Sequence, residues 1–536
     1  MKVLALPEVA PARAALVASS VLLSLVLLRA LTASKTAEPS KPKTKDGAPL
    51  FEPPSAGRVL GSMLEIARNA GRFHDWIGDV TALAGGKPWL LRALGRPDIV
   101  VVSTPELFED VQKTQFDSFG KGPYVHELTR DLAGNAIVLV DGPLWAFQRK
   151  VSVNLFSARL LRESMASVIH KNTLTLDRIL DAHAQSGGEL FDLSRLMYQF
   201  TMEVFTEIGF GLQLGALGNS KSHAFESALD EATVAVSKRS RLPTPVWKLM
   251  RALNVGSERE LRECIKIIDE NVMGIIAKTM EAHQRGDAPG RADLVSLFLE
   301  HSASEKGDYT VDAKLLKDIA LNMLVAGRDT SAEAMCWFLY CLSTRPDVEA
   351  KVRAEILEKL PELASGATPF VPVDALQGLV YLEAALKESL RLFPLFAFVR
   401  RVAFEDVELS DGTFVPQGTY VAMAPFTMAR RTDVWGEDAA EYNPERFLDP
   451  ATGKLRQISI FKFNSFWAGP RSCVGMKLAM LEMKTVLAKV LARFRFEIDP
   501  ANQPDGRVTY RMSLTLPIKD GLRVRVARLP TDATVA

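Results

Sequence analysis

Hydrophobic and polar positions along most of this chain repeat with the period of an α-helix. From about Arg58 onward, long stretches carry apolar residues three and four positions apart, and stretches with the two-residue alternation of a strand are short. Strands are predicted at residues 99–103, at 414–423, and as a C-terminal pair around 512–517 and 522–526. The pattern therefore predicts a fold that is mainly α with a small β portion.

The first 35 residues contain a long apolar stretch. Residues 14–28 carry no charge, and if the Arg29 side chain reaches toward the polar surface the stretch extends to Ser34. That is about the 20 residues that a membrane-spanning helix requires. More basic residues follow the stretch than precede it, so the positive-inside rule predicts that the bulk of the chain faces the cytosol. Residues 1–35 are predicted to be a membrane anchor, by default in the endoplasmic reticulum membrane; a cleaved signal peptide is the alternative.

Residues 36–57 are predicted to be a linker. They contain prolines interleaved with polar residues, and such a composition favours a stiff, extended chain. No internal repeat and no further boundary follow, so residues 58–536 are predicted to form a single large domain.

Composition narrows the class of protein. A chain of 536 residues with 47% hydrophobic residues can bury a large core, and a formal net charge of +1 offers no electrostatic footprint for nucleic acid. The four cysteines show neither metal-site spacing nor the density of a disulfide framework, which favours a reducing compartment. The seven histidines form no HxH or HxxxH pair.

One of the cysteines has unusual neighbours. Cys473 lies in the stretch FWAGPRSCVG, directly before a run with helical apolar spacing, so its thiol is predicted at a helix N-terminus, where a thiolate is favoured. Gly469 and Gly475 allow the backbone to approach a flat group, and Arg471 supplies a fixed cation. One thiolate and no nearby histidine fit a haem iron better than a structural zinc ion, which takes four ligands. A buried, inert cysteine is the alternative for Cys473 taken alone.

The ten-residue pattern favours the haem interpretation. Phe466, Gly469, Arg471, Cys473 and Gly475 give F-x-x-G-x-R-x-C-x-G, which resembles the haem-binding signature of the cytochrome P450 superfamily at all five positions. The resemblance implies the cytochrome P450 fold and haem b, with the Cys473 thiolate as axial ligand of the iron.

Two further segments resemble haem-contacting parts of that family. Trp145 and Arg149 lie four residues apart, so a helix would place their N–H donors on one face as a clamp for a carboxylate; an ordinary surface pair is the alternative. The resemblance implies that they bind a haem propionate. Arg401, seven residues after Pro394, is placed where the family commonly has a second propionate-binding cation, and Arg400 beside it is a competing candidate.

The sequence AGRDT at residues 326–330 lies in a helical stretch predicted over about 314–341. Gly327 and Thr330, whose hydroxyl can bond a carbonyl one turn back, predict a local distortion of this helix. The motif resembles A-G-x-D-T of the family's oxygen-binding helix. The resemblance implies that Asp329 and Thr330 are catalytic, as the acid and alcohol of a proton-delivery pair; a helix interior with a tolerated glycine is the alternative.

Glu388 and Arg391 are three residues apart on a predicted helix, and the stretch YNPERF contains Arg446. By resemblance these three residues form a buried charge triad with a structural role, in which each charge is paired.

Less universal stretches indicate a branch of the family. FDSFGKG at 116–122, PVWK at 245–248, DLVSLF at 293–298 and DGTFVP at 411–416 look like segments of the long-chain fatty acid ω-hydroxylases and alkane hydroxylases. Ala397 departs from this branch, many members of which have proline at that position. The resemblance implies insertion of one oxygen atom from O2 into a terminal or near-terminal C–H bond of a long-chain lipid.

The implied electron source is NADPH, through a separate flavoprotein, NADPH–cytochrome reductase, because the chain has no G-x-G-x-x-G fingerprint. Lys462, Lys477 and Lys484 are candidates for a basic docking patch for that partner, with plain solvation as the alternative. The catalytic domain would face the cytosol.

Other functions stay open at this point. A monooxygenase of sterols or other polycyclic lipids is one alternative. A haem-thiolate isomerase or dehydratase of lipid hydroperoxides is another, and a non-catalytic haem sensor or carrier is a third. The intact Asp329–Thr330 pair is evidence against the isomerase.

Overall fold

The computed structural model describes residues 40–219, 224–285, 298, 312–365, 371–503 and 506–530. Helices predominate and the strands are short, which confirms the predicted mainly α class. The predicted anchor, residues 1–35, and residues 36–39 of the predicted linker lie outside the described residues. None of the helices in the described part combines the length and the apolar character that a transbilayer segment requires.

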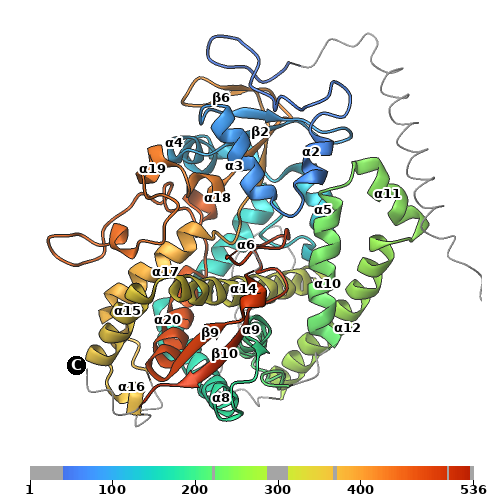
Figure 1. The fold of residues 1–536 in the computed structure, drawn as a ribbon. Helices are drawn as coiled ribbons and strands as arrows, with labels where there is room; N and C mark the ends of the chain where they lie inside the picture. Colours follow the sequence, from blue (N-terminus) through green and yellow to red (C-terminus); the bar gives the residue numbers. More distant parts are fainter. Residues whose placement is uncertain are drawn as a thin grey trace, which may run out of the picture.

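Helix α14 (Ala313–Thr344) crosses the middle of the molecule (Figure 1). Asp312 caps it, because its carboxylate accepts a hydrogen bond of 2.7 Å from the backbone N–H of Leu315. The helix matches the predicted stretch 314–341 and continues without a break through Gly327, so the expected distortion does not interrupt it. A Cβ at Gly327 would lie 2.1 Å from the ring of Phe205, and the glycine therefore allows α9 to approach closely.

The core is built around α14, which packs against α9 (Leu193–Phe210), α12 (Ser257–Gln284), α17 (Val380–Leu392) and α20 (Met476–Arg493). Further helices are α2 (Met63–Arg68), α3 (Phe73–Leu83), α4 (Pro105–Glu109), α5 (Gly122–Ala133), α6 (Gly142–Leu155), α7 (Ala158–Leu160), α8 (Ala166–Gln185), α10 (Ala224–Arg239), α11 (Thr244–Leu253), α15 (Pro346–Lys359), α16 (Glu362–Ser365), α18 (Pro425–Met428) and α19 (Thr432–Trp435). Short 3-10 or π-helical turns lie at Asp110–Thr114, Phe116–Ser118, Leu161–Met165, Ala375–Gly378, Pro444–Phe447, Gly469–Arg471 and Pro500–Asn502.

A five-stranded sheet has the order β1 (Trp89–Leu91), β2 (Ile99–Val102), β8 (Tyr420–Met423), β5 (Val399–Ala403) and β3 (Phe119–Gly120). β2 confirms the strand predicted at 99–103, and it pairs in parallel with β8. The strand predicted at 414–423 is two short strands, β7 (Phe414–Val415), which pairs with β6 (Val407–Glu408), and β8. Pro416 and Gly418, whose φ is +82°, separate them.

A three-stranded sheet has the order β4 (Phe191–Asp192), β10 (Arg523–Arg528) and β9 (Phe494–Ile498). The prediction that 512–517 pairs with 522–526 is wrong, because β10 pairs with β9 and β4. The backbone of 512–517 bonds to α14 instead. The N–H of Leu516 donates to Glu333 Oε2 over 3.1 Å, and its carbonyl accepts from Trp337 Nε1 over 2.7 Å.

The predicted charge triad is confirmed. Glu388 is fully buried, and its carboxylate accepts from Arg391 at 2.6 and 2.8 Å and from Arg446 Nε at 2.9 Å. Arg446 also pairs with Asp438 at 2.9 Å, and the remaining donors of Arg391 bond backbone carbonyls such as that of Ala439. Each charge of the triad therefore has its partners within the fold.

Candidate functional site

A loop of residues 464–475 precedes α20 and carries Cys473. Gln112 holds its first half, donating to Asn464 Oδ1 at 3.0 Å and accepting from the N–H of Ala468 at 2.8 Å. The N–H of Cys473 donates to the carbonyl of Phe466 over 2.8 Å, which closes the loop. The backbone is thus fixed on both sides of the thiol.

Two positions in this loop have left-handed backbone conformations. Gly469 has φ +64°, and a Cβ there would lie 1.9 Å from the carbonyl oxygen of Gln112, so only glycine fits. Trp467 has φ +60°, which costs a bulky residue free energy and persists only where the surroundings enforce it. The loop is therefore held in a specific, unfavourable shape.

The Cys473 side chain reaches an opening rather than the core, since the residue is exposed while Leu478 in the following helix is buried. Burial of its surroundings raises the pKa of the thiol, and the N–H groups of Gly475 and Met476 and the charge of Arg149 act in the opposite direction. The predicted helix-terminus effect is present, but burial outweighs it in the protein alone. Metal coordination reverses that balance, because a coordinating thiol is deprotonated.

Helix α6 places Trp145 and Arg149 beside the loop. Both Nη atoms of Arg149 donate to Ser472, to its carbonyl oxygen at 2.5 Å and to its hydroxyl at 3.1 Å. The Trp145 ring lies against Phe116, with centroids 5.4 Å apart, and against the guanidinium of Arg471 at 4.7 Å. The predicted helix face is present; the propionate-binding role of Trp145 and Arg149 stays a prediction.

Three cations gather next to this loop around one carboxylate; we call Lys121, Arg401, Arg471 and Asp141 the cation cluster. Arg471 pairs with Asp141 at 2.6 Å, but its Nε is buried without a hydrogen-bond partner in the described part of the chain. Arg401 is 7% exposed, and among the described residues its guanidinium donates only to the carbonyl of Arg400. Burial and the charge of Arg471 lower the pKa of Arg401 to about 9.

Lys121 is the member of the cluster that the sequence analysis missed. Burial, with the charges of Arg401 and Arg471, holds the pKa of its ammonium well below the usual value. The ammonium forms no ion pair within the described residues. Lys121 stands in the FDSFGKG stretch, but nothing in that stretch indicates an ion-binding role, since only the fold brings the lysine to Arg401.

The structure distinguishes between the two candidate cations, Arg400 and Arg401. Successive residues of β5 point to opposite faces, and Arg400 lies over the ring of Tyr124 at 5.9 Å, away from Asp141. Arg401 is the one that joins the cation cluster.

These residues fit a haem group. Three cations against one carboxylate leave an excess of buried positive charge that a dianionic ligand would neutralise, and an orphaned Arg471 N–H is available to it. A flat ring also requires the close backbone approach that Gly469 and Gly475 permit. Phe466, Gly469, Arg471, Cys473 and Gly475 lie together in the loop, as their contiguity requires.

On α14, Thr330 donates to the carbonyl of Ala326 over 2.7 Å, as predicted from the sequence. Ala326 is exposed on a helix that is otherwise largely buried, so this face borders an opening. Asp329 is buried behind it and accepts from Arg328 over 2.8 Å. Burial raises the pKa of Asp329, against the charge of Arg328. The proton-delivery role of Asp329 and Thr330 stays a prediction.

Arg328 connects Asp329 with the surface. Its Nη1 also lies 2.8 Å from Asp230, whose side chain is 49% exposed. A line of charged groups thus leads from solvent through Asp230 and Arg328 to Asp329.

Glu333 was also missed. It lies one turn beyond Asp329, is 4% exposed, and bonds Tyr198 Oη at 2.9 Å and Thr515 Oγ1 at 2.7 Å. Burial and the charge of Asp329 raise the pKa of Glu333 to about 8. A carboxyl at the i+4 position from Asp329 in an apolar helix was the available signal.

The basic docking patch needs a correction. Lys484 is 5% exposed and pairs with Glu383 at 2.8 Å, because it lies on the inward face of α20, so it cannot meet a partner. Lys477 is exposed, and Lys462 lies over the Trp435 ring at 4.6 Å.

Comparison with known proteins places this geometry in a family. Residues 52–522 match the family model described as Cytochrome P450. The chain is 32% identical to cytochrome P450 86B1 of Arabidopsis thaliana, over 85% of this chain and 82% of that protein, and 32% identical to cytochrome P450 94B1 of the same species, over 92% of each. It is 30% identical to cytochrome P450 monooxygenase cyp1 of Mycosarcoma maydis, over 89% of this chain and 75% of that protein. The chain therefore belongs to the cytochrome P450 family, whose members are haem-thiolate proteins.

Proposed function

We propose that this protein is a monooxygenase that inserts one oxygen atom from O2 into a terminal or near-terminal C–H bond of a long-chain fatty acid or alkane. The observation that carries the proposal is that one fold contains both the Cys473 loop and a face of α14 that bears Ala326 and Thr330. The first supplies a thiol beside an excess of cations, and the second a hydroxyl at an opening.

Haem, when bound, supplies the iron chemistry that activates dioxygen. The chain's own part is to hold that group. Cys473 provides the ligand atom, and Arg401, Arg471 and Lys121 provide charge for the propionates. Arg149 keeps Ser472, and with it the neighbouring Cys473, in place through its two hydrogen bonds. A site fixed in this way needs little rearrangement during the reaction.

Proton supply is assigned to α14. The Thr330 hydroxyl holds a proton that it shares with the Ala326 carbonyl, and Asp329 holds a charge that Arg328 compensates. Asp230 extends this line of groups to the solvent, so protons can reach Asp329 without opening the apolar side of the site to bulk water.

The long-chain substrate rests on the segments that resemble the fatty acid ω-hydroxylase branch. The relatives' names state the family and not a substrate, so these segments carry the assignment. The stretch 395–400, proposed to line the pocket, includes the start of β5 and ends next to Arg401. Ala397 in this stretch is 5% exposed and replaces the proline of many branch members, which leaves its backbone less constrained.

Electrons are proposed to come from NADPH through a separate flavoprotein reductase, with the exposed Lys477 as a docking residue. Residues 1–35 are proposed to anchor the protein in the endoplasmic reticulum membrane, with the catalytic domain facing the cytosol. Reversal of charge in Lys477→Glu should slow reductase-supported turnover more at low salt than at high salt. An unchanged rate would remove Lys477 from the docking surface.

A ferric-haem absorbance titration tests the substrate. The carbon-monoxide complex of the reduced protein is first checked for the red-shifted band of thiolate ligation. Fatty acids of graded length, the matching alkanes and a sterol are then titrated. A saturable low-to-high-spin shift with one chain length and none with the sterol supports the proposal. A shift with the sterol alone, or none with any chain, contradicts the long-chain assignment.

The Thr330→Ala variant tests the proton-supply assignment. We expect NADPH consumption to continue while product per NADPH falls by about a hundredfold, the lower end of what general acid catalysis contributes. Ser331→Ala is the matched control, because Ser331 is the next residue of α14 and is buried. Full coupling in Thr330→Ala would contradict the proton-delivery role of Thr330.

A further inference from the structure

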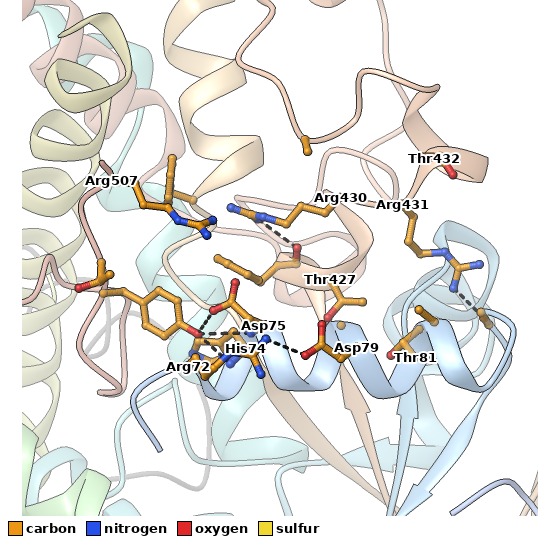
Figure 2. A pocket seen from close by; sticks show the side chains of 18 of the residues that line it. Arg72, His74, Asp75, Asp79, Thr81, Thr427, Arg430, Arg431, Thr432 and Arg507 are labelled. Carbon is orange, nitrogen blue, oxygen red and sulfur yellow. Dashed lines mark hydrogen bonds and ion pairs between the residues drawn. The ribbon is translucent and has the colours of Figure 1, made fainter. Parts of the chain in front are cut away.

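A second cavity lies where α3, α18 and the segment 507–510 meet. Its volume is about 1170 Å³, and charged side chains make up much of its wall (Figure 2). The lining residues include none from the Cys473 loop and none from residues 326–330. Whatever this cavity does is therefore separate from the site described above.

Several charges of the wall are already paired. Arg72 pairs with Asp79 at 2.6 Å, and Arg431 pairs with Asp433 at 2.5 Å. Asp75 accepts a hydrogen bond of 2.6 Å from the hydroxyl of Tyr510. These contacts pair most charges of the wall, and the remaining charged residues are Arg430 and Arg507.

Arg430 and Arg507 have no carboxylate within ion-pair distance among the described residues. Figure 2 shows their guanidinium groups pointing toward one another from opposite walls of the cavity. Two like charges that face each other across a cavity repel, and each would gain from an anion placed between them.

Arg430 is fixed in position. Its Nη1 donates to the carbonyls of Leu392 at 2.7 Å and Phe426 at 3.2 Å, and its Cζ lies 3.6 Å from the centre of the Phe426 ring. Nε and Nη2 have no hydrogen-bond partner among the described residues. A guanidinium held in this way presents a rigid pair of donors, the geometry that binds carboxylate or phosphate through two parallel bonds.

The rest of the wall is uncharged and partly aromatic. Phe393 and Tyr340 line the cavity beside Phe426. Burial and the charge of Arg430 lower the pKa of His74 to about 3, so His74 is neutral at physiological pH. The cavity thus combines a cationic end with apolar surface, and its volume exceeds what a small ion fills.

We propose that this cavity is a second binding site, for a carboxylate or phosphate group carried on a partly apolar body, with Arg430 and Arg507 as its anion-binding residues. A lipid headgroup and a soluble organic anion share this chemistry. The site does not depend on the proposed reaction, so its occupancy can be measured without turnover.

Calorimetric titration of the full-length, haem-loaded protein with inorganic phosphate at low ionic strength is the first test. We expect saturable binding in the millimolar range or tighter. Arg507→Gln should weaken it by about tenfold through loss of one charge-assisted contact. Arg507 is exposed, and its side chain forms no hydrogen bond or ion pair within the described residues, so we expect this variant to leave the fold intact.

Asp75→Asn should change the phosphate affinity in the opposite direction. An amide oxygen still accepts from Tyr510, and removal of the negative charge should strengthen phosphate binding by about threefold. Arg58→Gln is the matched control, since Arg58 is exposed and does not line the cavity; it should bind as the wild type does. Equal affinity of the wild type, Arg507→Gln and Asp75→Asn, or no saturable binding, would overturn the proposal.

Soluble short-chain lipids identify the source of the anion. If dihexanoyl phosphatidic acid binds more tightly than phosphate, and dihexanoyl phosphatidylcholine does not bind, the site takes a lipid headgroup. Equal affinity for phosphate and phosphatidic acid assigns it to soluble anions. In either case Arg507→Gln must reduce the affinity, and binding that this variant leaves unchanged contradicts the site.

Discussion

The residues of the charge triad and of the cation cluster are buried or half-buried, but the two groups are built in opposite ways. In the triad, Glu388 is surrounded by two arginines, and the surplus positive charge is taken up by Asp438 and by backbone carbonyls. In the cation cluster, Arg401, Arg471 and Lys121 share the single carboxylate of Asp141. A closed network stabilises the fold, whereas an open one lowers stability until a ligand arrives. The comparison shows that buried charge without a partner in the fold marks a ligand-binding site.

The largest expected effect is on the closed network. Glu388→Gln leaves Arg391 and Arg446 without a counter-charge, and we expect a loss of about 3–5 kcal/mol in the free energy of unfolding. Denaturant unfolding followed by circular dichroism measures it. Glu358→Gln is the control, because Glu358 is exposed on α15 and, among the described residues, forms an ion pair with Lys359 only. If both variants unfold at the same denaturant concentration, the triad is not the stabilising network described.

The open cluster should respond in its ligand affinity. Arg401→Gln removes a cation that has no counter-charge of its own, so haem affinity should fall by about tenfold to a hundredfold while the stability of the haem-free protein is kept. Haem titration of the apoprotein, together with its thermal unfolding, separates the two quantities. Arg400→Gln is the control on the other face of β5. An apoprotein destabilised as strongly as by Glu388→Gln would erase the distinction between the clusters.

Glu333 illustrates a third way to bury a charge, which is to neutralise it by protonation. Its raised pKa, about 8, means that the folded state holds the proton more tightly than the unfolded state does. Its contribution to stability is therefore full below about pH 4 and is lost as the pH rises through 8. Asp329, Tyr198 and Cys336 are the titratable groups that interact with it, and Arg328 and Asp230 act on Tyr198.

Glu333→Gln should remove part of this pH dependence. The variant should match the wild type near pH 5 and exceed it by about 1–3 kcal/mol near pH 9. Unfolding curves across that range measure the difference. Glu482→Gln should act in the same direction, because burial also raises the pKa of Glu482 to about 8. Parallel pH profiles for Glu333→Gln and the wild type would mean that Glu333 is ionised in the fold.

The smallest expected effect is a gain in the stability of the haem-free protein. Lys121→Met replaces a buried ammonium that has no ion pair in the described part of the chain, and it should stabilise the haem-free protein by about 1 kcal/mol. Haem affinity should decrease in the same variant. Thermal unfolding of both forms gives the comparison, with Lys477→Met as a control at an exposed position. A destabilised apoprotein would place Lys121 in a closed network like that of Glu388.

Patterns within short stretches of the sequence predicted the individual helices and strands that those stretches form. The helix after Cys473, the helix around residues 326–330 and the strand at β2 follow from contiguous apolar spacing, and the charge triad follows from two short motifs that the family places together. Residues 512–517 show the limit. They alternate like a strand, but Glu333 and Trp337 take their backbone groups, a competition that single-sequence patterns do not contain.

The same limit explains the missed residues. Lys121 lies 280 positions before Arg401, and only the pairing of β3 with β5 brings their segments together. Arg430 and Arg507 line the same cavity for a similar reason, because their distant segments both lie near α3. Glu333 was nearer to being predicted, since its position relative to Asp329 was visible, but its partners Tyr198 and Thr515 were not. Packing between distant segments, rather than the residues themselves, made these charges distinctive.

The β4–β10–β9 sheet has a consequence for how the chain folds. β10 pairs Val524 with Phe191, and the N–H of Leu193 donates to the carbonyl of Leu522 over 2.8 Å, so contacts close a loop of more than 300 residues. Such closure carries a large entropic cost and forms slowly. During synthesis the edge of β4 remains unpaired until residues 523–528 have been made. Strand β10 therefore completes this sheet late in folding. A chain truncated before residue 523 would lack the strand that packs against α8 and α9.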